Sequence, residues 1–205
     1  MRSEPAVAVA RCEPALASPN DVEAGTTFVE LLAAVAVIGI VAAMSVPMVT
    51  AGVDRARGRA AARYLAARVA AAKLQAVSRV ANVALRFEQR DGRVLFGTVI
   101  DGNGNGVRTT DITAGIDRVL EPPIELSAHY PGVVIGLAPG TPATAPVMVG
   151  SANLWSFTPV GTATPGSVYV RGPDGTQWVV RVFGGTGRAR VLRYEPVAGA
   201  WVDSS

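Results

Sequence analysis

A single apolar run near the N-terminus constrains this chain more than any other feature. Between Phe28 and Val53 the only ionisable side chain is Glu30. A helix of about 26 residues is roughly 39 Å long, which is enough to cross the hydrocarbon core of a bilayer. An acid costs about 2.5 to 3.5 kcal/mol at the bilayer centre and less near its ends, so Glu30 is by default a functional residue that needs a cationic partner. The run predicts a transmembrane helix over residues 26–53.

The start of this run resembles the class III signal of type IV pilins and type II secretion pseudopilins. Gly25 and Thr26 precede Phe-Val-Glu-Leu-Leu, an Ala/Val/Ile-rich stretch follows, and Pro47 comes about five turns later. The resemblance implies that a prepilin peptidase cuts after Gly25 and methylates Thr26. It also implies that Glu30 neutralises the N-terminal ammonium of a neighbouring subunit in a filament. The chain departs from the family in having Thr26 where Phe is usual, and acids rather than basic residues at 21–23.

Residues 1–25 are the expected leader peptide. They have no helical or strand period, and they hold the only cysteine of the chain, Cys12. A mature chain without them has no thiol, so its outer domain depends on its core rather than on disulfides. Two alternatives stay open. One is an uncleaved signal anchor, which has no need of Glu30. The other is a Sec-type signal peptide, whose apolar region of about 7 to 15 residues is much shorter than this run.

Residues 54–82 are expected to continue the helix as an amphipathic segment, after a kink or local melting at Pro47. The segment is rich in arginine, and the positive-inside rule would place it in the cytoplasm, whereas the resemblance implies an outward-facing C-terminal domain. Such a basic face is most often simply solvated. Contact with lipid headgroups before assembly, or with acidic neighbours in a filament, are the alternatives. The apolar face that needs a cover consists of Leu65, Val69, Ala72, Ala76, Val80 and Val83.

The hydrophobic period changes to two after Asn82, so residues 83–205 predict a β-rich globular domain. A hairpin is expected around the turn at 90–93, and an antiparallel meander in the last third of the chain. The predicted fold class is therefore α+β and pilin-like, with a long N-terminal helix packed on a C-terminal antiparallel sheet. The expected strands are 83–88, 94–100, 124–126, 133–137, 154–158, 167–171, 177–183 and 188–194.

Stretches of this domain resemble the GspH/FimT branch, which contains type II secretion pseudopilin H and related minor pilins. They are Phe157–Gly161, Gly166–Val170, Thr186–Val191 and a loop at Val99–Val107. The resemblance implies a minor pseudopilin of a type II secretion pseudopilus that contributes to protein secretion. The alternative is a FimT-like type IV minor pilin for pilus assembly or DNA uptake. Either would be a single-pass inner-membrane protein with a periplasmic C-terminal domain, whose partners are prepilin peptidase and other pilins.

A candidate metal site begins at Asp101. Asp101, Asn103 and Asn105, followed by a glycine, have the opening spacing of a calcium-binding loop. The twelfth position, which should supply the closing carboxylate, is Ile112, and Asp111 comes one residue early. A Gly/Asn turn between strands is the alternative interpretation.

A candidate nucleic-acid site lies at Arg188 and Arg190, which share one face of a predicted strand and have Arg181 and Arg193 nearby in sequence. In FimT-type minor pilins a Gly-Arg-x-Arg stretch is associated with DNA binding, and bidentate guanidinium–phosphate contacts give this a physical basis. The alternative is that two exposed arginines protect an edge strand from pairing.

Catalytic chemistry has little support in this sequence. The chain has one histidine, His129, and its one cysteine is in the expected leader, so His/Cys metal clusters and Cys–His catalysis lack residues. No Gly-x-Ser-x-Gly stretch supports a Ser-His-Asp triad. We predict a protein that is not an enzyme and that needs no cofactor other than, in the calcium alternative, calcium.

Overall fold

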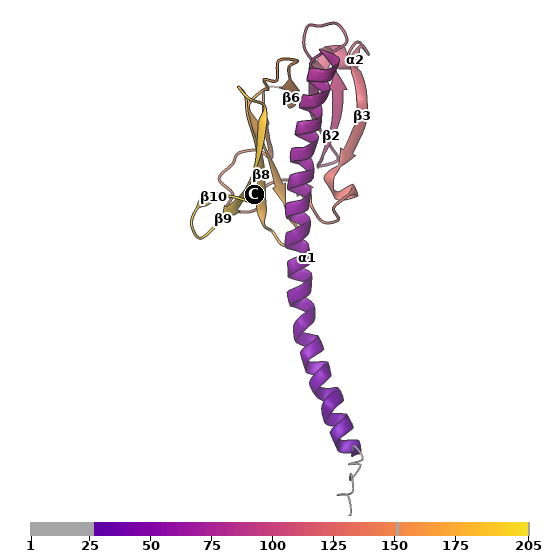
Figure 1. Cartoon of the computed structure of the whole chain (residues 1–205), viewed down its shortest axis with the longest axis vertical. Helices are drawn as coiled ribbons and strands as arrows, with labels where there is room; N and C mark the ends of the chain where they lie inside the picture. Colours follow the sequence, from indigo (N-terminus) through magenta and orange to yellow (C-terminus); the bar gives the residue numbers. More distant parts are fainter. Residues whose placement is uncertain (1–26, 151, 205) are drawn as a thin grey trace, which may run out of the picture. The chain divides into compact units, whose positions relative to one another are not determined.

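The structure, a computed structural model, describes residues 27–150 and 152–204, without the side chains of 44–48. It has the predicted α+β class: a long helix, α1 (Phe28–Arg79), precedes two antiparallel sheets (Figure 1). The expected leader at 1–25 and the expected methylation site Thr26 lie outside the described residues.

Helix α1 belongs to two compact units, which divide between Met44 and Ser45. The helix continues through Pro47, so the local melting expected there does not occur. In the first unit the apolar side chains from Phe28 to Val41 are exposed. No helix among the described residues is long and apolar enough to cross a membrane, and the span expected over 26–53 is not confirmed.

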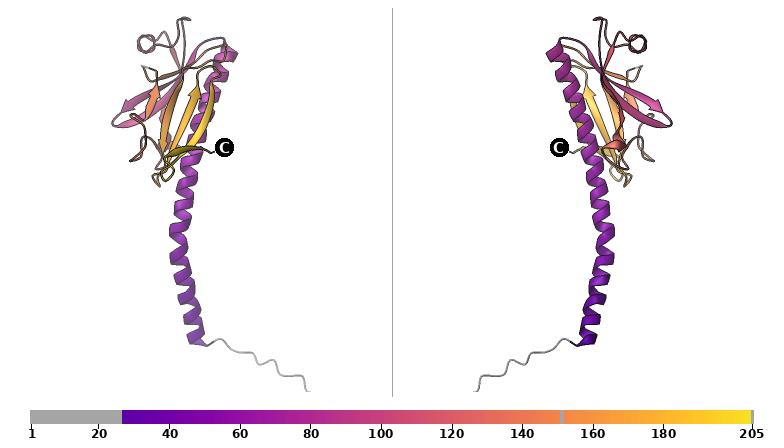
Figure 2. Two further views of the ribbon diagram at one scale, coloured as in Figure 1. Left: turned by 90° about the vertical axis from the view of Figure 1, so that its left-hand side faces the viewer. Right: turned by 90° about the vertical axis from the view of Figure 1, so that its right-hand side faces the viewer.

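The second unit combines the rest of α1 with both sheets. This part of α1 lies between the sheets in Figure 1 and to one side of them in Figure 2. The first sheet has the strand order β3 (Arg118–Glu125), β2 (Arg93–Ile100), β1 (Val83–Arg90) and β6 (Leu154–Phe157). The second has the order β10 (Ala200–Asp203), β9 (Arg188–Glu195), β8 (Gln177–Phe183), β7 (Gly166–Arg171) and β4 (Val134–Ile135), with β5 (Val147–Val149) also paired to β7. Two short helices, α2 (Thr109–Thr113) and the 3-10 helix η1 (Leu126–Ala128), flank β3.

The predicted hairpin is present as β1 and β2. The two strands pair in register from Val83 opposite Ile100 to Arg90 opposite Arg93. The two turn residues, Asp91 and Gly92, have φ values of 51° and 75°. Positive φ at both central positions is the requirement of the type I′ turn, and an Asp-Gly pair meets it at low steric cost.

The core lies where α1 meets both sheets. The predicted apolar face of the helix is buried at Leu65, Val69, Ala72 and Ala76. Large side chains from the sheets pack against it, and the small residues of the helix let the strands approach closely. The core residues that come from the two sheets include Phe87, Phe96, Trp155, Phe157, Val168, Val170, Trp178 and Val180.

The prediction was wrong at Val80, which does not belong to this face. It lies just past the helix with a φ of 51°, and 79% of its surface is exposed. The Ala81 N–H donates to the Ala76 carbonyl at 3.3 Å, and the Val80 N–H donates to the Val77 carbonyl at 3.4 Å. These two bonds form a Schellman cap, whose left-handed position is usually glycine. The hydrophobic spacing does not reveal where the helix ends, because the spacing continues into Val83 of β1.

Three strands of the two sheets differ from the strands predicted from the sequence. β3 is longer than the expected strand at 124–126 and includes Pro122 and Pro123. It is an edge strand, where a missing backbone N–H can face away from the ladder. β5 and β10, with three and four residues, were not predicted.

Candidate functional site

Glu30 is exposed in the first turn of α1. The backbone N–H of Glu30 donates to the side-chain oxygen of Thr27 at 3.3 Å, so Thr27 caps the helix. Among the described residues, none forms a hydrogen bond or ion pair with the Glu30 carboxylate. The acid is thus available to a group from outside the described chain. Of the residues predicted to act with it, Gly25 and Thr26 lie outside the described residues, as does the side chain of Pro47.

Arg188 and Arg190 lie on one face of β9, as predicted. The register between β8 and β9 places Arg181 opposite Arg190, and therefore on the same face. The guanidinium of Arg190 lies 5.5 Å from the centre of the Phe183 ring, a cation–π distance. Arg181 is held by a hydrogen bond from its Nε to Ser167 on β7, at 3.3 Å. We call Arg181, Arg188 and Arg190 the basic face.

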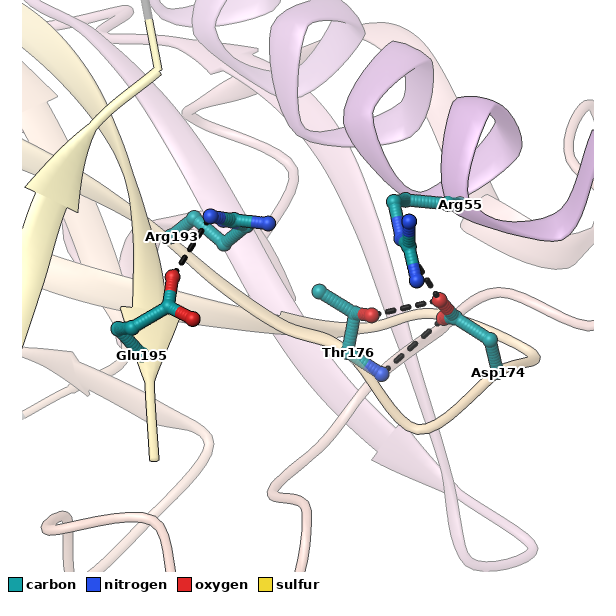
Figure 3. A network of polar contacts seen from close by, with 5 residues as sticks. All are labelled: Arg55, Asp174, Thr176, Arg193 and Glu195. Carbon is teal, nitrogen blue, oxygen red and sulfur yellow. Dashed lines mark hydrogen bonds and ion pairs between the residues drawn. The ribbon is translucent and has the colours of Figure 1, made fainter. Parts of the chain in front are cut away.

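Arg193 does not join the basic face. It alternates with Arg188 and Arg190 along β9 and lies on the side that faces α1. There it pairs with Glu195 at 2.6 Å, while Arg55 of α1 approaches Asp174 at 3.8 Å (Figure 3). The Asp174 carboxylate also accepts bonds from the backbone and hydroxyl of Thr176. Alternation of side chains along β9 alone places Arg193 on the face opposite to Arg188 and Arg190.

The turn before the basic face is fixed by α1. The ammonium of Lys73 donates to the Thr186 carbonyl at 2.7 Å. Gly187 follows with a φ of 57°, and a Cβ there would lie 2.8 Å from the Gly161 carbonyl oxygen. The packing of the turn therefore explains why the Gly-Arg-x-Arg stretch begins with glycine: a residue without a Cβ lets the turn lie close to both Gly161 and Lys73.

The basic face also has an acid nearby. A pocket of about 260 Å³ is lined by Arg188, Arg190 and Arg63 together with Asp203. The half of β9 that carries Arg188 and Arg190 extends beyond its pairing with β10, which begins opposite Leu192. Both earlier interpretations, phosphate contact and protection of a strand edge, are compatible with this geometry.

The Asp101 loop is organised by the chain itself. One carboxylate oxygen of Asp101 accepts bonds from the backbone of Asn103 and Gly104, at 3.1 and 2.8 Å. The other accepts from the Gly106 backbone at 2.7 Å and from the Asn82 side chain at 2.9 Å. A carboxylate has about four lone-pair positions, so these donors use them all. This geometry favours the turn interpretation over a calcium site.

These hydrogen bonds control the charge of Asp101. Burial by itself would raise the pKa of Asp101, but the bond from Asn82 and the three backbone bonds outweigh it and hold the pKa below its ordinary value. The carboxylate therefore stays ionised inside the loop. The φ values of Gly104 and Gly106 are 81° and 90°, so the glycines, and not Asn103 or Asn105, take the left-handed positions.

A second buried acid, Asp117, completes this loop and was missed by the sequence analysis. Its two carboxylate oxygens accept bonds from the backbone of Gly102 at 3.0 Å and of Arg108 at 2.9 Å. Asn103 and Asn105 turn their amide nitrogens to Asp111 rather than offering oxygens to a cation. Among the described residues, no group of three or more His, Cys, Asp or Glu side chains could hold a metal ion.

The remaining candidates have structural contacts. His129 lies with its ring 5.5 Å from that of Tyr64 on α1. Trp155 and Trp178 belong to the core, and Trp201 packs against Tyr169 and Tyr194.

Comparison with known proteins identifies the family. The model of the family described as type II transport protein GspH matches residues 61–186, which is more than half of the 205-residue chain. A search of the curated proteins and a search of the solved structures find no match. The matched part includes the core face of α1 and the first eight strands, and it ends just before Gly187. This chain belongs to the GspH family of type II transport proteins.

Proposed function

We propose that this protein is a minor pseudopilin of a type II secretion pseudopilus and contributes to protein secretion. The match to the family of type II transport protein GspH supports a structural, pseudopilin-type role in type II secretion. In the proposal, prepilin peptidase cuts after Gly25 and methylates Thr26. The processed protein is anchored in the inner membrane by the apolar part of α1, with its sheet domain on the periplasmic side.

One observation carries the assembly step of this proposal: Glu30 is an acid in an apolar helix surface, and none of the described residues pairs with it. An unpaired carboxylate among apolar side chains is costly away from water. The methylated ammonium of Thr26 on a neighbouring subunit would be a partner of matching charge. Such a pair fixes the axial register between two helices, because a displacement of either helix would separate the charges.

The exposed apolar side chains of the first unit fit the same role. Phe28, Leu31, Val35 and Ile38 are all exposed, at spacings of three and four residues. A helix with such a surface needs lipid or other helices around it. In a membrane it would contact acyl chains, and in a filament it would contact the equivalent helices of other subunits.

The decisive measurement is the intact mass of the protein after extraction from membranes. The expected mass is that of a chain that begins at Thr26 with one added methyl group. A chain that retains residues 1–25 would refute the processing step, and with it the filament-subunit proposal. The Gly25→Ala variant is the control, since it should keep the leader when the wild-type chain loses it.

A second candidate function is that of a minor pilin that binds DNA. It is favoured by the basic face, where Arg181, Arg188 and Arg190 come from two paired strands. The test is a DNA mobility-shift titration at several salt concentrations. Binding should weaken steeply with salt and should be lost in the Arg188→Ala, Arg190→Ala double variant. The Arg93→Ala, Arg118→Ala double variant is the matched control, because it removes two arginines from the other sheet.

A further inference from the structure

A pocket with three arginines opens beside α1, at the end of its apolar run. It has a volume of about 480 Å³. Arg55 and Arg59 come from α1, and Arg193 comes from β9. Among the described residues, Asp203 is the one acid that lines this pocket. Two of these arginines also have an acidic neighbour outside the lining: Arg55 approaches Asp174 at 3.8 Å, and Arg193 pairs with Glu195 at 2.6 Å (Figure 3).

Arg55 and Arg193 retain donors for a ligand, whereas Arg59 already donates to the Ser204 carbonyl at 2.9 Å. Arg55 approaches Asp174 only through its Nε, at 3.8 Å, which is too long for a hydrogen bond. Its two terminal nitrogens have no hydrogen-bond partner among the described residues. Arg193 uses one terminal nitrogen for Glu195. Because a guanidinium carries five N–H groups, both side chains can donate to an additional acceptor.

The walls of the pocket combine these charges with apolar surface. Gly52 and Ala56 of α1 line it, as do the largely buried Trp178 and the exposed side chain of Val202. A phosphate with attached hydrocarbon fits such a site better than a free inorganic anion does, because a free anion leaves the apolar surface in water.

The position of the pocket along α1 also indicates which class of ligand it could meet. Arg55 comes two residues after Val53, the last residue of the apolar run, and this is roughly 3 Å along the helix axis. The polar headgroup layer of a bilayer is about 5 to 7 Å deep on each side of the hydrocarbon core. If the run lies in the membrane, as the proposed function on which this inference rests requires, Arg55 is at headgroup depth.

We infer that Arg55, Arg59 and Arg193 bind the headgroup phosphate of an anionic membrane phospholipid before the subunit enters a filament. The guanidinium groups donate to the phosphate oxygens, which are strong charge-assisted contacts. Val202 and the last turn of the apolar run contact the start of the acyl chains. The bound lipid holds the sheet domain against the membrane surface, and it must be released when the subunit leaves the bilayer.

The test is a calorimetric titration of the full-length chain in a neutral detergent. The probe is dihexanoyl phosphatidylglycerol below its micelle concentration. We expect saturable binding that becomes about tenfold weaker in Arg55→Gln, because one charge-assisted contact is lost. Arg57→Gln is the matched control: it removes the same charge from the same helix, but Arg57 pairs with Asp54 at 3.0 Å and does not line the pocket.

Three outcomes would overturn the inference. Equal affinity in Arg55→Gln and wild type would show that the pocket is not the binding site. An equal loss in Arg57→Gln would show unspecific attraction to a basic helix. Inorganic phosphate or dihexanoyl phosphatidylcholine that binds as tightly as the phosphatidylglycerol probe would exclude an anionic lipid as the selected ligand. The intact mass of the same preparation separates the two proposals, since a processed chain that does not bind lipid refutes only the inference.

Discussion

Lys73 on α1 donates a 2.7 Å hydrogen bond to the Thr186 carbonyl, one residue before the glycine that opens the basic face. This bond joins the helix to the β8–β9 turn. The same turn lies against Gly161, so two stretches that resemble the GspH/FimT branch, Phe157–Gly161 and Thr186–Val191, meet at one lysine. The family resemblance of these stretches thus reflects a packing requirement as well as any role of the arginines.

Replacement of Gly187 by alanine should destabilise the protein. The φ of 57° is unfavourable for a residue with a Cβ, and the Cβ would lie 2.8 Å from the Gly161 oxygen. We expect a loss of about 1 to 3 kcal/mol in the free energy of unfolding, measured by denaturant titration. Gly185→Ala is the control, because no heavy atom lies within 4 Å of its Cβ position. Equal stability of the two variants would contradict the close contact.

Replacement of Val80 by glycine should stabilise the protein. Val80 takes the left-handed position of the Schellman cap with a φ of 51°, which is strained for a β-branched residue. Since its side chain is exposed, glycine would lose little packing there. We expect a gain of about 1 kcal/mol and a higher melting temperature. Ser78→Gly, inside the last helical turn, should instead lose about 0.5 to 1 kcal/mol.

The long-range features of this fold were less predictable from the sequence than its local ones. Asp91-Gly92 marks a hairpin turn because the residue types themselves favour positive φ. The alternation of Gln177–Phe183 predicts β8 with its observed ends. The Schellman cap at Val80 contradicts its local sequence, and β3 tolerates two prolines only because it lies at a sheet edge, which is a property of the assembled sheet.

In the candidate sites, too, the local features were more predictable from the sequence than the long-range ones. Alternation along one strand was enough to place Arg188 and Arg190 on one face. The addition of Arg181 depends on the β8–β9 register, which no single strand specifies, whereas alternation along β9 alone already places Arg193 on the opposite face. Asp117 was missed because its partners, Gly102 and Arg108, are backbone groups, and a backbone donor leaves no residue type to recognise in the sequence.

Asp101 should stabilise the protein in a pH-dependent way. Its pKa in the folded protein lies below the ordinary 3.8, so its stabilising contribution is complete above that value and is lost as the pH falls through the folded pKa. Asp101→Asn should lose about 1.5 to 3 kcal/mol at pH 7, because bonds to a charged acceptor are replaced. The difference between variant and wild type should shrink below about pH 4. A difference that is constant from pH 7 to pH 3 would contradict the charge-based explanation.

Calcium should leave the melting temperature unchanged. The four N–H donors already occupy the Asp101 carboxylate, and Asn103 uses its side-chain oxygen to accept from the Asn105 backbone at 3.2 Å. Binding would have to break these bonds. The measurement is a thermal melt in about millimolar calcium, the range of weak extracellular sites, with a chelator as reference. A calcium-dependent increase that disappears in Asp101→Asn would restore the metal hypothesis.

Glu30→Gln should separate folding from assembly. None of the described residues pairs with the Glu30 carboxylate, so its neutralisation removes no contact within the described chain. We expect an unchanged melting temperature and normal processing at Gly25, but a strong loss of secretion and of cross-linking to other pseudopilins, because the neighbouring ammonium loses its counter-charge. Asp54→Asn is the control: it neutralises an acid of the same helix that already pairs with Arg57. Normal secretion by Glu30→Gln would mean that another group sets the register between subunits.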